Sequence, residues 1–169
     1  MHIAVDANAE GLLSAASKAA RKPARGGVAN LICIAESAET LSYELGAVAS
    51  RMTVILPWSS LLRTVAMPDV DSLRKLSAVC LSGANFEIVF SYDGDRDARE
   101  NAPLALVAID EYHVSTLSAL YQEAGLNVDC IQRISLDELK EYDTTWAHRL
   151  AFGCPREVWR IRGRKGALG

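Results

Sequence analysis

Short apolar runs alternate along this chain with segments in which apolar residues recur at helical spacing. The apolar runs predict buried strands and lie at residues 2–6, 30–35, 52–56 and 84–92. The segments with helical spacing predict helices at residues 7–21, 70–79 and 110–124. Two final runs, 126–134 and 157–162, predict an antiparallel strand pair. Strands that alternate with helices are typical of an α/β fold with a mostly parallel sheet.

The strand predicted at residues 52–56 is the element around which the rest is organised. It ends at Pro57, which cannot donate a ladder hydrogen bond, and a helix is expected to open at Leu61. In α/β sheets ligands bind at the carboxyl ends of strands, so residues 58–60 are expected at the mouth of a site. Burial in the core is the alternative for Trp58, because large aromatic side chains are mostly buried.

Asp6 closes the first predicted strand. In nucleotide-binding α/β folds an acid at this place accepts hydrogen bonds from the ribose hydroxyls, because a carboxylate takes two donors at once. Capping of the following helix is the alternative, since Asp is a good N-cap residue. After the second strand, Glu36 or Ser37 is placed to cap a helix that runs to about residue 48.

The net charge of −3 conceals an uneven distribution of the eighteen Lys and Arg residues. The first basic block is Lys18, Arg21, Lys22 and Arg25, and the second basic block is Arg149, Arg156, Arg160, Arg162, Arg164 and Lys165. Residues 87–100, between the two blocks, are acidic. A charged run is most often a solvated surface, but two such blocks can also form one surface that binds RNA phosphates.

The four cysteines are scattered, without a Cys-x-x-Cys spacing, and the chain has three histidines, so no metal site is predicted. The N-terminus lacks a charged segment followed by an apolar one, and no apolar run approaches the roughly 20 residues of a membrane helix. We therefore expect a reduced, cytoplasmic protein without membrane contact. With 169 residues, half of them hydrophobic, residues 1–169 are expected to form a single domain.

Three motifs follow one another along the chain. They are Lys-Pro-Ala-Arg-Gly-Gly at residues 22–27, Leu-Pro-Trp at residues 56–58, and Thr-Trp-Ala-His-Arg-Leu-Ala-Phe-Gly at residues 145–153. In this order they resemble the aminoglycoside-resistance 16S rRNA methyltransferases that act on N1 of adenine 1408. The resemblance extends from Ile3 to about Gly163. The family's Gly-rich S-adenosylmethionine loop, and the strand before it, are expected upstream of Met1.

The resemblance implies the Rossmann-like fold of S-adenosylmethionine-dependent methyltransferases, with the first strand absent from this chain. It implies S-adenosylmethionine as cofactor and 16S rRNA in the 30S subunit as partner, and it leaves the oligomeric state open. Trp58 and Trp146 are expected to stack on the target adenine, whereas Trp159 alternates with its neighbours on a strand and is expected in the core. The cofactor contacts are assigned to Asp6, Ala38, Glu39, Ile55, Ser60 and Thr144. The RNA contacts are assigned to Lys18, Arg21, Lys22, Arg25, Arg149 and Arg156.

Two alternatives to an adenine-1408 methyltransferase remain open. One is a truncated, catalytically impaired remnant that keeps the RNA surface and lacks the cofactor loop. The other is a nucleotide-dependent enzyme that acts on small molecules, for which Asp6 would serve equally well. The two tryptophans and the basic blocks favour RNA over a small molecule, while the absent glycine loop favours the remnant.

Overall fold

The structure is a computed structural model that describes residues 1–37, 40–41, 45–93, 97, 109–142, 144–152 and 156–167, with the main chain only at residues 145 and 146. The chain divides into two compact units, Met1–Ser42 and Tyr43–Gly169. Each unit is described by itself. A single domain over residues 1–169 remains a prediction.

The first unit is a β-α-β arrangement. Strand β1 (His2–Asp6) pairs in parallel with β2 (Leu31–Ala35), and Asp6 lies opposite Ala35. Helix α1 (Ala9–Ala19) contacts both strands, with Leu12 as its buried residue. A short 3-10 helix, η1 (Pro23–Arg25), lies in the loop between α1 and β2. The carboxyl ends of both strands therefore meet at one edge of this small sheet.

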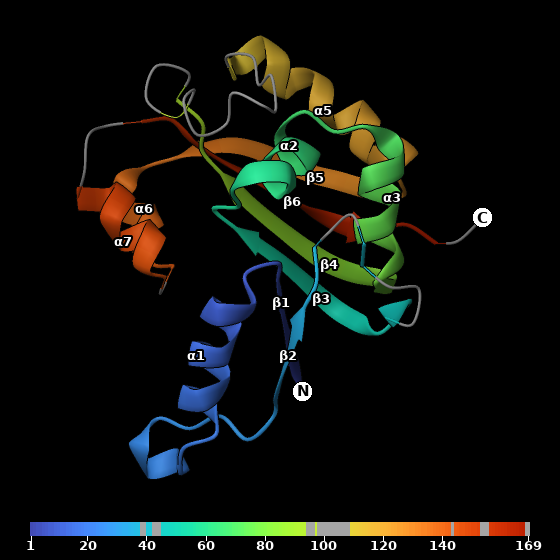
Figure 1. Cartoon of the computed structure of the whole chain (residues 1–169). Coiled ribbons are helices and arrows are strands. Elements are labelled where there is room, and N and C mark those ends of the chain that lie inside the picture. Colours follow the sequence, from blue (N-terminus) through green and yellow to red (C-terminus); the bar gives the residue numbers. More distant parts are fainter. Residues whose placement is uncertain are drawn as a thin grey trace. The chain divides into compact units, whose positions relative to one another are not determined.

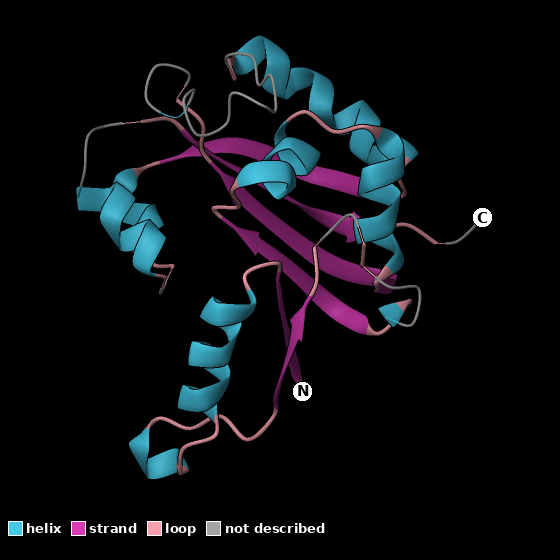
Figure 2. Ribbon diagram, viewed as in Figure 1, coloured by secondary structure: helices cyan, strands magenta, loops and turns pink. Residues whose placement is uncertain are grey.

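The second unit is built on a four-stranded sheet in the order β3-β4-β6-β5 (Figures 1 and 2). Its strands are β3 (Ala49–Ile55), β4 (Cys80–Phe90), β5 (Leu126–Ile134) and β6 (Val158–Lys165). The β3–β4 pair is parallel, and β6 is antiparallel to both β4 and β5. The helices are α2 (Ser59–Ala66), α3 (Val70–Ala78), α5 (Glu111–Glu123), α6 (Leu136–Leu139) and α7 (Thr145–Phe152).

Alternation along β4 divides the core of the second unit between two faces of the sheet. Phe86 stacks on Tyr121 of α5 with ring centroids 6.2 Å apart, on the face where α2, α3 and α5 lie together (Figure 1). Val89 points the other way and joins an apolar cluster with residues of α6 and α7, among them Leu139 and Ala147. The second face therefore carries α6 and α7, and Trp146 belongs to α7.

Gly163 lies in the middle of β6, between β4 and β5, in the most crowded part of the sheet. A Cβ atom at this position would lie 2.1 Å from the backbone oxygen of Asn127 and 2.7 Å from the Phe86 ring. Real Cβ atoms do not approach other atoms so closely, so only glycine fits between these two neighbours.

The α/β class, the terminal antiparallel pair and the position of most elements are confirmed, while several boundaries were predicted wrongly. Helix α2 begins at Ser59 and not at Leu61. Asn8 caps α1, so capping by Asp6, the alternative to ribose binding, is not found. Strand β4 begins at Cys80 and continues through Gly83, although the sequence predicted a start at residue 84. Strand β6 continues to Lys165, beyond the predicted end at residue 162.

The helix expected to run to about residue 48 does not extend that far, because residues 46 and 47 form a turn in which Ala47 has φ 51°. Residues 38–39 and 42–44 of that segment lie outside the described residues. Among the described strands, β1 pairs with β2 and β3 pairs with β4, so the parallel strands belong to two sheets.

Within the described part of the chain, no helix is long and apolar enough to cross a membrane. Nor do the residues that the structure describes gather three or more His, Cys, Asp or Glu side chains around a point that would suit a metal ion. Cys33, Cys80 and Cys130 are free thiols, and Cys154 lies outside the described residues.

Candidate functional site

The chain turns sharply where β3 ends. Leu56 and Ser59 both have positive φ, 49° and 55°, and between them Trp58 is extended with φ −128° and ψ 164°. The Leu56 amide donates to the Val89 carbonyl at 2.7 Å, which holds the start of this turn against β4. Left-handed backbone in residues other than glycine costs of order 1–3 kcal/mol, and it persists where surrounding contacts enforce it, often at functional sites.

Trp58 is presented by this turn at the surface. It is the N-cap residue of α2, and it is 37% exposed, so it does not lie in the core. Trp159, in contrast, is 6% exposed within the sheet, as its alternation with neighbouring residues predicted. A partly exposed tryptophan offers a flat apolar surface on which a base can stack.

The other predicted residues of this end of the second unit are less exposed. Ser60 lies in the first turn of α2 and is half-buried. Ile55 is half-buried too, and it packs with Leu56 against the apolar cluster under α6 and α7. Ile55, at the end of β3, thus packs against the same apolar cluster as α6 and α7, and α7 contains most of the third motif.

Thr144 lies directly before α7. Its Oγ1 accepts a hydrogen bond from the Ala147 amide at 3.0 Å, and its backbone carbonyl accepts one from the His148 amide at 3.1 Å. This is the N-capping role that threonine performs well, and it accounts for a hydroxyl here without a ligand. Trp146 is the second residue of α7, but its side chain lies outside the described part of the chain.

Asp6 is exposed at the carboxyl end of β1. Its Oδ1 accepts a hydrogen bond from the Asn8 amide at 2.8 Å, so it orders the turn into α1 while Asn8 itself forms the cap. A carboxylate has about four acceptor positions, which leaves capacity for two ribose hydroxyls. The Asp6 carboxylate therefore has acceptor positions that the hydrogen bond from Asn8 does not use. Ala38 and Glu39, which follow the neighbouring strand β2, lie outside the described residues.

The first basic block surrounds the end of α1 and the loop after it. All four of its side chains are exposed, and within the described residues none of them forms an ion pair. The loop is compact because Gly27 comes close to the preceding helix: a Cβ there would lie 1.6 Å from the Arg21 carbonyl oxygen. Gly27 is thus required for the shape in which Lys22 and Arg25 are displayed.

The second basic block is mostly engaged with carboxylates. Arg156 binds Asp97 through two hydrogen bonds of 3.0 and 3.3 Å, and these side chains are only 12% and 7% exposed. The remaining ion pairs join Arg160 to Glu138 at 3.2 Å, Arg162 to Glu87 at 2.7 Å and Arg164 to Asp129 at 4.0 Å. Arg149 is exposed on α7 and has contacts of its own.

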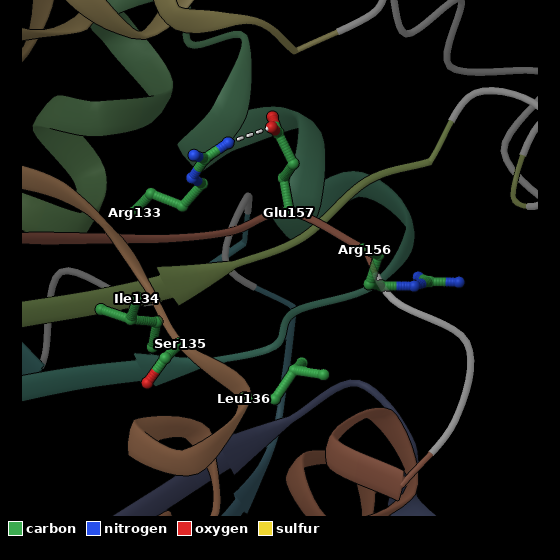
Figure 3. Close-up of a pocket in the computed structure, with 6 residues that line it drawn as sticks. All are labelled: Arg133, Ile134, Ser135, Leu136, Arg156 and Glu157. Carbon is green, nitrogen blue, oxygen red and sulfur yellow. Dashed lines mark hydrogen bonds and ion pairs between the residues drawn. The ribbon is translucent and has the colours of Figure 1, made fainter.

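A cavity of about 480 Å³ lies where β5 runs into α6 (Figure 3). Ile134, Ser135 and Leu136 form one side of it, and Arg133 bridges to Glu157 at 2.5 Å on another. Figure 3 shows the Arg156 guanidinium pointing away from that bridge. No residue that the sequence assigned to the cofactor lines this cavity, so we place no ligand in it.

Sequence reasoning missed two features of this end of the molecule. The pairing of Arg156 with Asp97 joins residues 59 positions apart, and no local pattern reveals it. The buried carboxylate of Glu87 was read only as part of an acidic segment, although its place inside an apolar strand is unusual for a glutamate and is a signal in its own right.

Comparison with known proteins gives consistent matches. The family model described as "NpmA: 16S rRNA (adenine(1408)-N(1))-methyltransferase" matches residues 1–165. The 16S rRNA (adenine(1408)-N(1))-methyltransferase of Escherichia coli is 29% identical over 164 residues, which are 96% of this chain and 75% of that protein.

Two solved structures extend the comparison. The aminoglycoside resistance methyltransferase NpmB1 is 38% identical with a TM-score of 0.78, and the match covers 96% of this chain and 74% of that one. A W203A mutant of the 16S rRNA (adenine(1408)-N(1))-methyltransferase from Catenulisporales acidiphilia, solved with cosubstrate SAM, is 28% identical with a TM-score of 0.80. That match covers 97% of this chain and 74% of the mutant.

Proposed function

Because the chain belongs to the 16S rRNA (adenine(1408)-N(1))-methyltransferase family, we propose that it transfers a methyl group from S-adenosylmethionine to N1 of adenine 1408 of 16S rRNA. The observation that carries this proposal is the partly exposed Trp58, held by a sharp turn at the carboxyl end of β3. This is the edge of an α/β sheet at which ligands bind.

The reaction requires the protein mainly to position the methyl donor and the adenine. S-adenosylmethionine supplies an electrophilic methyl group, and N1 of a neutral adenine carries a lone pair, so no general base is required. The residues of this chain act by orienting the acceptor and by excluding alternative poses. Trp58 offers a stacking surface for a base that has been turned out of its helix, and we place Trp146, on α7, on the second face of that base.

The cofactor residues follow from the same proposal. Asp6 accepts the ribose hydroxyls, and Ala38 and Glu39 lie beside the adenine of the donor. Ile55, Ser60 and Thr144 line the reacting end, where Ile55 provides apolar surface and the two hydroxyls orient polar groups.

The proposed RNA surface contains Lys18, Arg21, Lys22 and Arg25, together with Arg149 and Arg156. The first four are exposed in the described part of the chain without carboxylate partners there, which suits them for phosphate contacts. The proposed substrate form is the 30S subunit in the cytoplasm. Methylation at this position would weaken aminoglycoside binding there and confer resistance.

The test is methylation of purified 30S subunits by the full chain with labelled donor, with the modified position located by a primer-extension stop. Trp58→Ala is expected to lower the rate by tenfold to a few hundredfold, because stacking is worth roughly 1–3 kcal/mol. Trp58→Phe, which keeps a stacking surface, is the matched control and should retain more activity than the alanine variant.

The outcomes separate the candidate functions. A parental rate in Trp58→Ala would contradict the stacking role. A chain that binds 30S subunits but leaves adenine 1408 unmodified would instead be an RNA-binding member of the family without activity.

A further inference from the structure

A glutamate carboxylate is buried in the middle of β4. Glu87 is 7% exposed, and its Oε1 accepts three hydrogen bonds: one from the Tyr142 hydroxyl at 2.8 Å and two from Arg162, at 2.9 and 2.7 Å. Its Oε2 lies 3.5 Å from the Arg51 guanidinium. Buried carboxylates are found where such partners satisfy them, so this group is held in one orientation.

Near neutral pH Glu87 is ionised and Tyr142 is protonated. Burial disfavours the charged form of Glu87, but the hydrogen bonds from Tyr142 and Arg162 outweigh it, so the pKa of Glu87 lies below its usual value. Burial and the hydrogen bond to Glu87 raise the pKa of Tyr142. Tyr142 therefore remains a protonated donor to a charged acceptor, which is a strong type of hydrogen bond.

Tyr142 connects this fixed point on the sheet to the beginning of α7. Its amide donates to the Leu139 carbonyl at 3.2 Å, and its own carbonyl accepts from the Thr144 amide at 2.8 Å. Thr144 in turn caps α7 through the Ala147 amide. A continuous series of hydrogen bonds thus leads from β4 to the first turn of the helix that carries Trp146.

Apolar packing alone would fix the position of α7 less precisely than apolar packing combined with hydrogen bonds. Among the described side chains of α7, Ala147 and Ala151 are buried in the cluster with Val89 and Val158, and Leu150 packs against that cluster. Such contacts are non-directional, so they permit small rotations and shifts of the helix. A hydrogen bond from Tyr142 to a carboxylate on a central strand restricts those movements, because its strength depends on distance and angle.

We infer that Glu87 and Tyr142 form a positioning pair that sets the first turn of α7, and with it Trp146, for the methyl transfer. The inference rests on the proposed function. Neither residue is assigned a contact with the donor or the adenine, so both act through the helix. A displacement of about 1 Å at a reacting centre can cost a hundredfold in rate, which gives such a pair a measurable role.

Tyr142→Phe is the variant of choice, because it removes one hydroxyl and leaves Glu87 paired with Arg162. We expect the single-turnover methylation rate at saturating 30S subunits to fall by roughly tenfold to a hundredfold. The dissociation constants for 30S subunits and for the donor should change by less than about twofold. Glu87→Gln keeps a side-chain oxygen that accepts from Tyr142, and it should retain the rate within about threefold.

Tyr121→Phe is the matched control. It removes another internal hydroxyl of the same unit, which donates to the Val65 carbonyl at 2.8 Å on the other face of the sheet. This variant should lose thermal stability but keep the parental rate. A purely stabilising role of Tyr142 would make the two variants alike, with lower melting temperatures and unchanged saturating rates, and would overturn the inference.

Hydrogen–deuterium exchange on the full chain gives a readout that does not need activity. Exchange at the Ala147 and His148 amides should rise in Tyr142→Phe and stay parental in Tyr121→Phe. If exchange does not rise, the pair does not hold α7. If it rises while the rate is unchanged, the pair orders α7 without serving the reaction. A parental chain that does not methylate contradicts the proposed function, and the exchange data still decide whether the pair holds the helix.

Discussion

The two basic blocks contain the same kinds of residue but differ in their surroundings. Lys18, Arg21, Lys22 and Arg25 are exposed around the end of α1, without a carboxylate partner among the described residues. In the second basic block, Arg156, Arg160, Arg162 and Arg164 each form an ion pair with a glutamate or aspartate of the second unit. Groups of basic residues that look alike in the sequence thus have different surroundings in the structure.

The difference shows what a count of charges leaves out. The charge of an exposed cation without an internal partner is available to attract phosphates. The charge of a cation paired with a buried carboxylate is largely neutralised, and the pair contributes to the stability of the fold. The sequence suggested one RNA surface made from both blocks. The structure shows carboxylate partners for four arginines of the second block and none, among the described residues, for the first block. RNA binding by either block remains a prediction, to be tested residue by residue.

The largest expected effect comes from breaking the pair between Arg156 and Asp97. Arg156→Ala removes two hydrogen bonds from the nearly buried carboxylate of Asp97, which also accepts one from the Asp93 amide, and we expect it to lower the free energy of unfolding by about 3 kcal/mol. Urea denaturation measures this change. Arg25→Ala, in the first block, is the control and should change stability by less than about 0.5 kcal/mol. Equal effects of the two substitutions would remove the distinction between the blocks.

The pairing of Arg162 with Glu87 should appear in the pH dependence of stability. Because the pKa of Glu87 is lowered from its usual 4.5, its ionised form stabilises the fold above about pH 4.5, and this stabilisation is lost as the pH falls through the lowered value. We expect Glu87→Gln to be less stable than the parent at pH 7, by about 1–2 kcal/mol, with the difference shrinking below pH 4.5. A difference that is constant with pH, measured by denaturation at several pH values, would show that the carboxylate charge is unimportant.

The first basic block is tested by binding to 30S subunits. Lys22→Glu should weaken binding by about tenfold at moderate salt, and Lys22→Ala should reduce the salt dependence by about one phosphate contact. Titration at several salt concentrations measures both effects. Arg162→Gln is a control from the second block. It should leave the salt dependence unchanged, and a loss equal to that of Lys22→Ala would assign the paired arginines to RNA as well.

The smallest effect is expected at Arg164, whose 4.0 Å contact with Asp129 joins two exposed side chains. Arg164→Gln should change the free energy of unfolding by less than about 0.5 kcal/mol, because exposed ion pairs are screened by water and salt. Thermal denaturation is sufficient to measure it. A loss comparable to that of Arg156→Ala would mean that burial does not determine the strength of these pairs.

The parts that the sequence predicted well are those with local causes. The strand that stops at Pro57, the strand that ends at Asp6 and the buried position of Trp159 follow from proline chemistry, hydrophobic runs and alternation. Capping of α1 by Asp6, the alternative to ribose binding, is not found, because Asn8 lies directly before the helix and forms the cap. Asp6 and Ile55 lie at strand ends, and Ser60 and Thr144 lie at helix starts, where the fold class expects ligand-binding residues.

The parts that were not predicted depend on contacts across the fold. The positive φ values of Leu56 and Ser59 carry no sequence signal, since these residue types rarely adopt them and do so here under tertiary constraint. The hydrogen bond from Tyr142 to Glu87 joins residues 55 positions apart, and its geometry exists only once α6 has packed on the sheet. Such contacts become visible only in three dimensions.

The packing around Gly163 has a consequence for interpreting variants of the gene that encodes this chain. Any side chain there would collide with the Asn127 carbonyl and the Phe86 ring, so a missense change at this codon separates β6 from its neighbours whatever residue it introduces. In surveys of bacterial isolates, a gene copy that encodes another amino acid at this position should be scored as non-functional even when every proposed catalytic and RNA-binding residue is intact. Carriers of such a copy would be expected to remain susceptible to aminoglycosides.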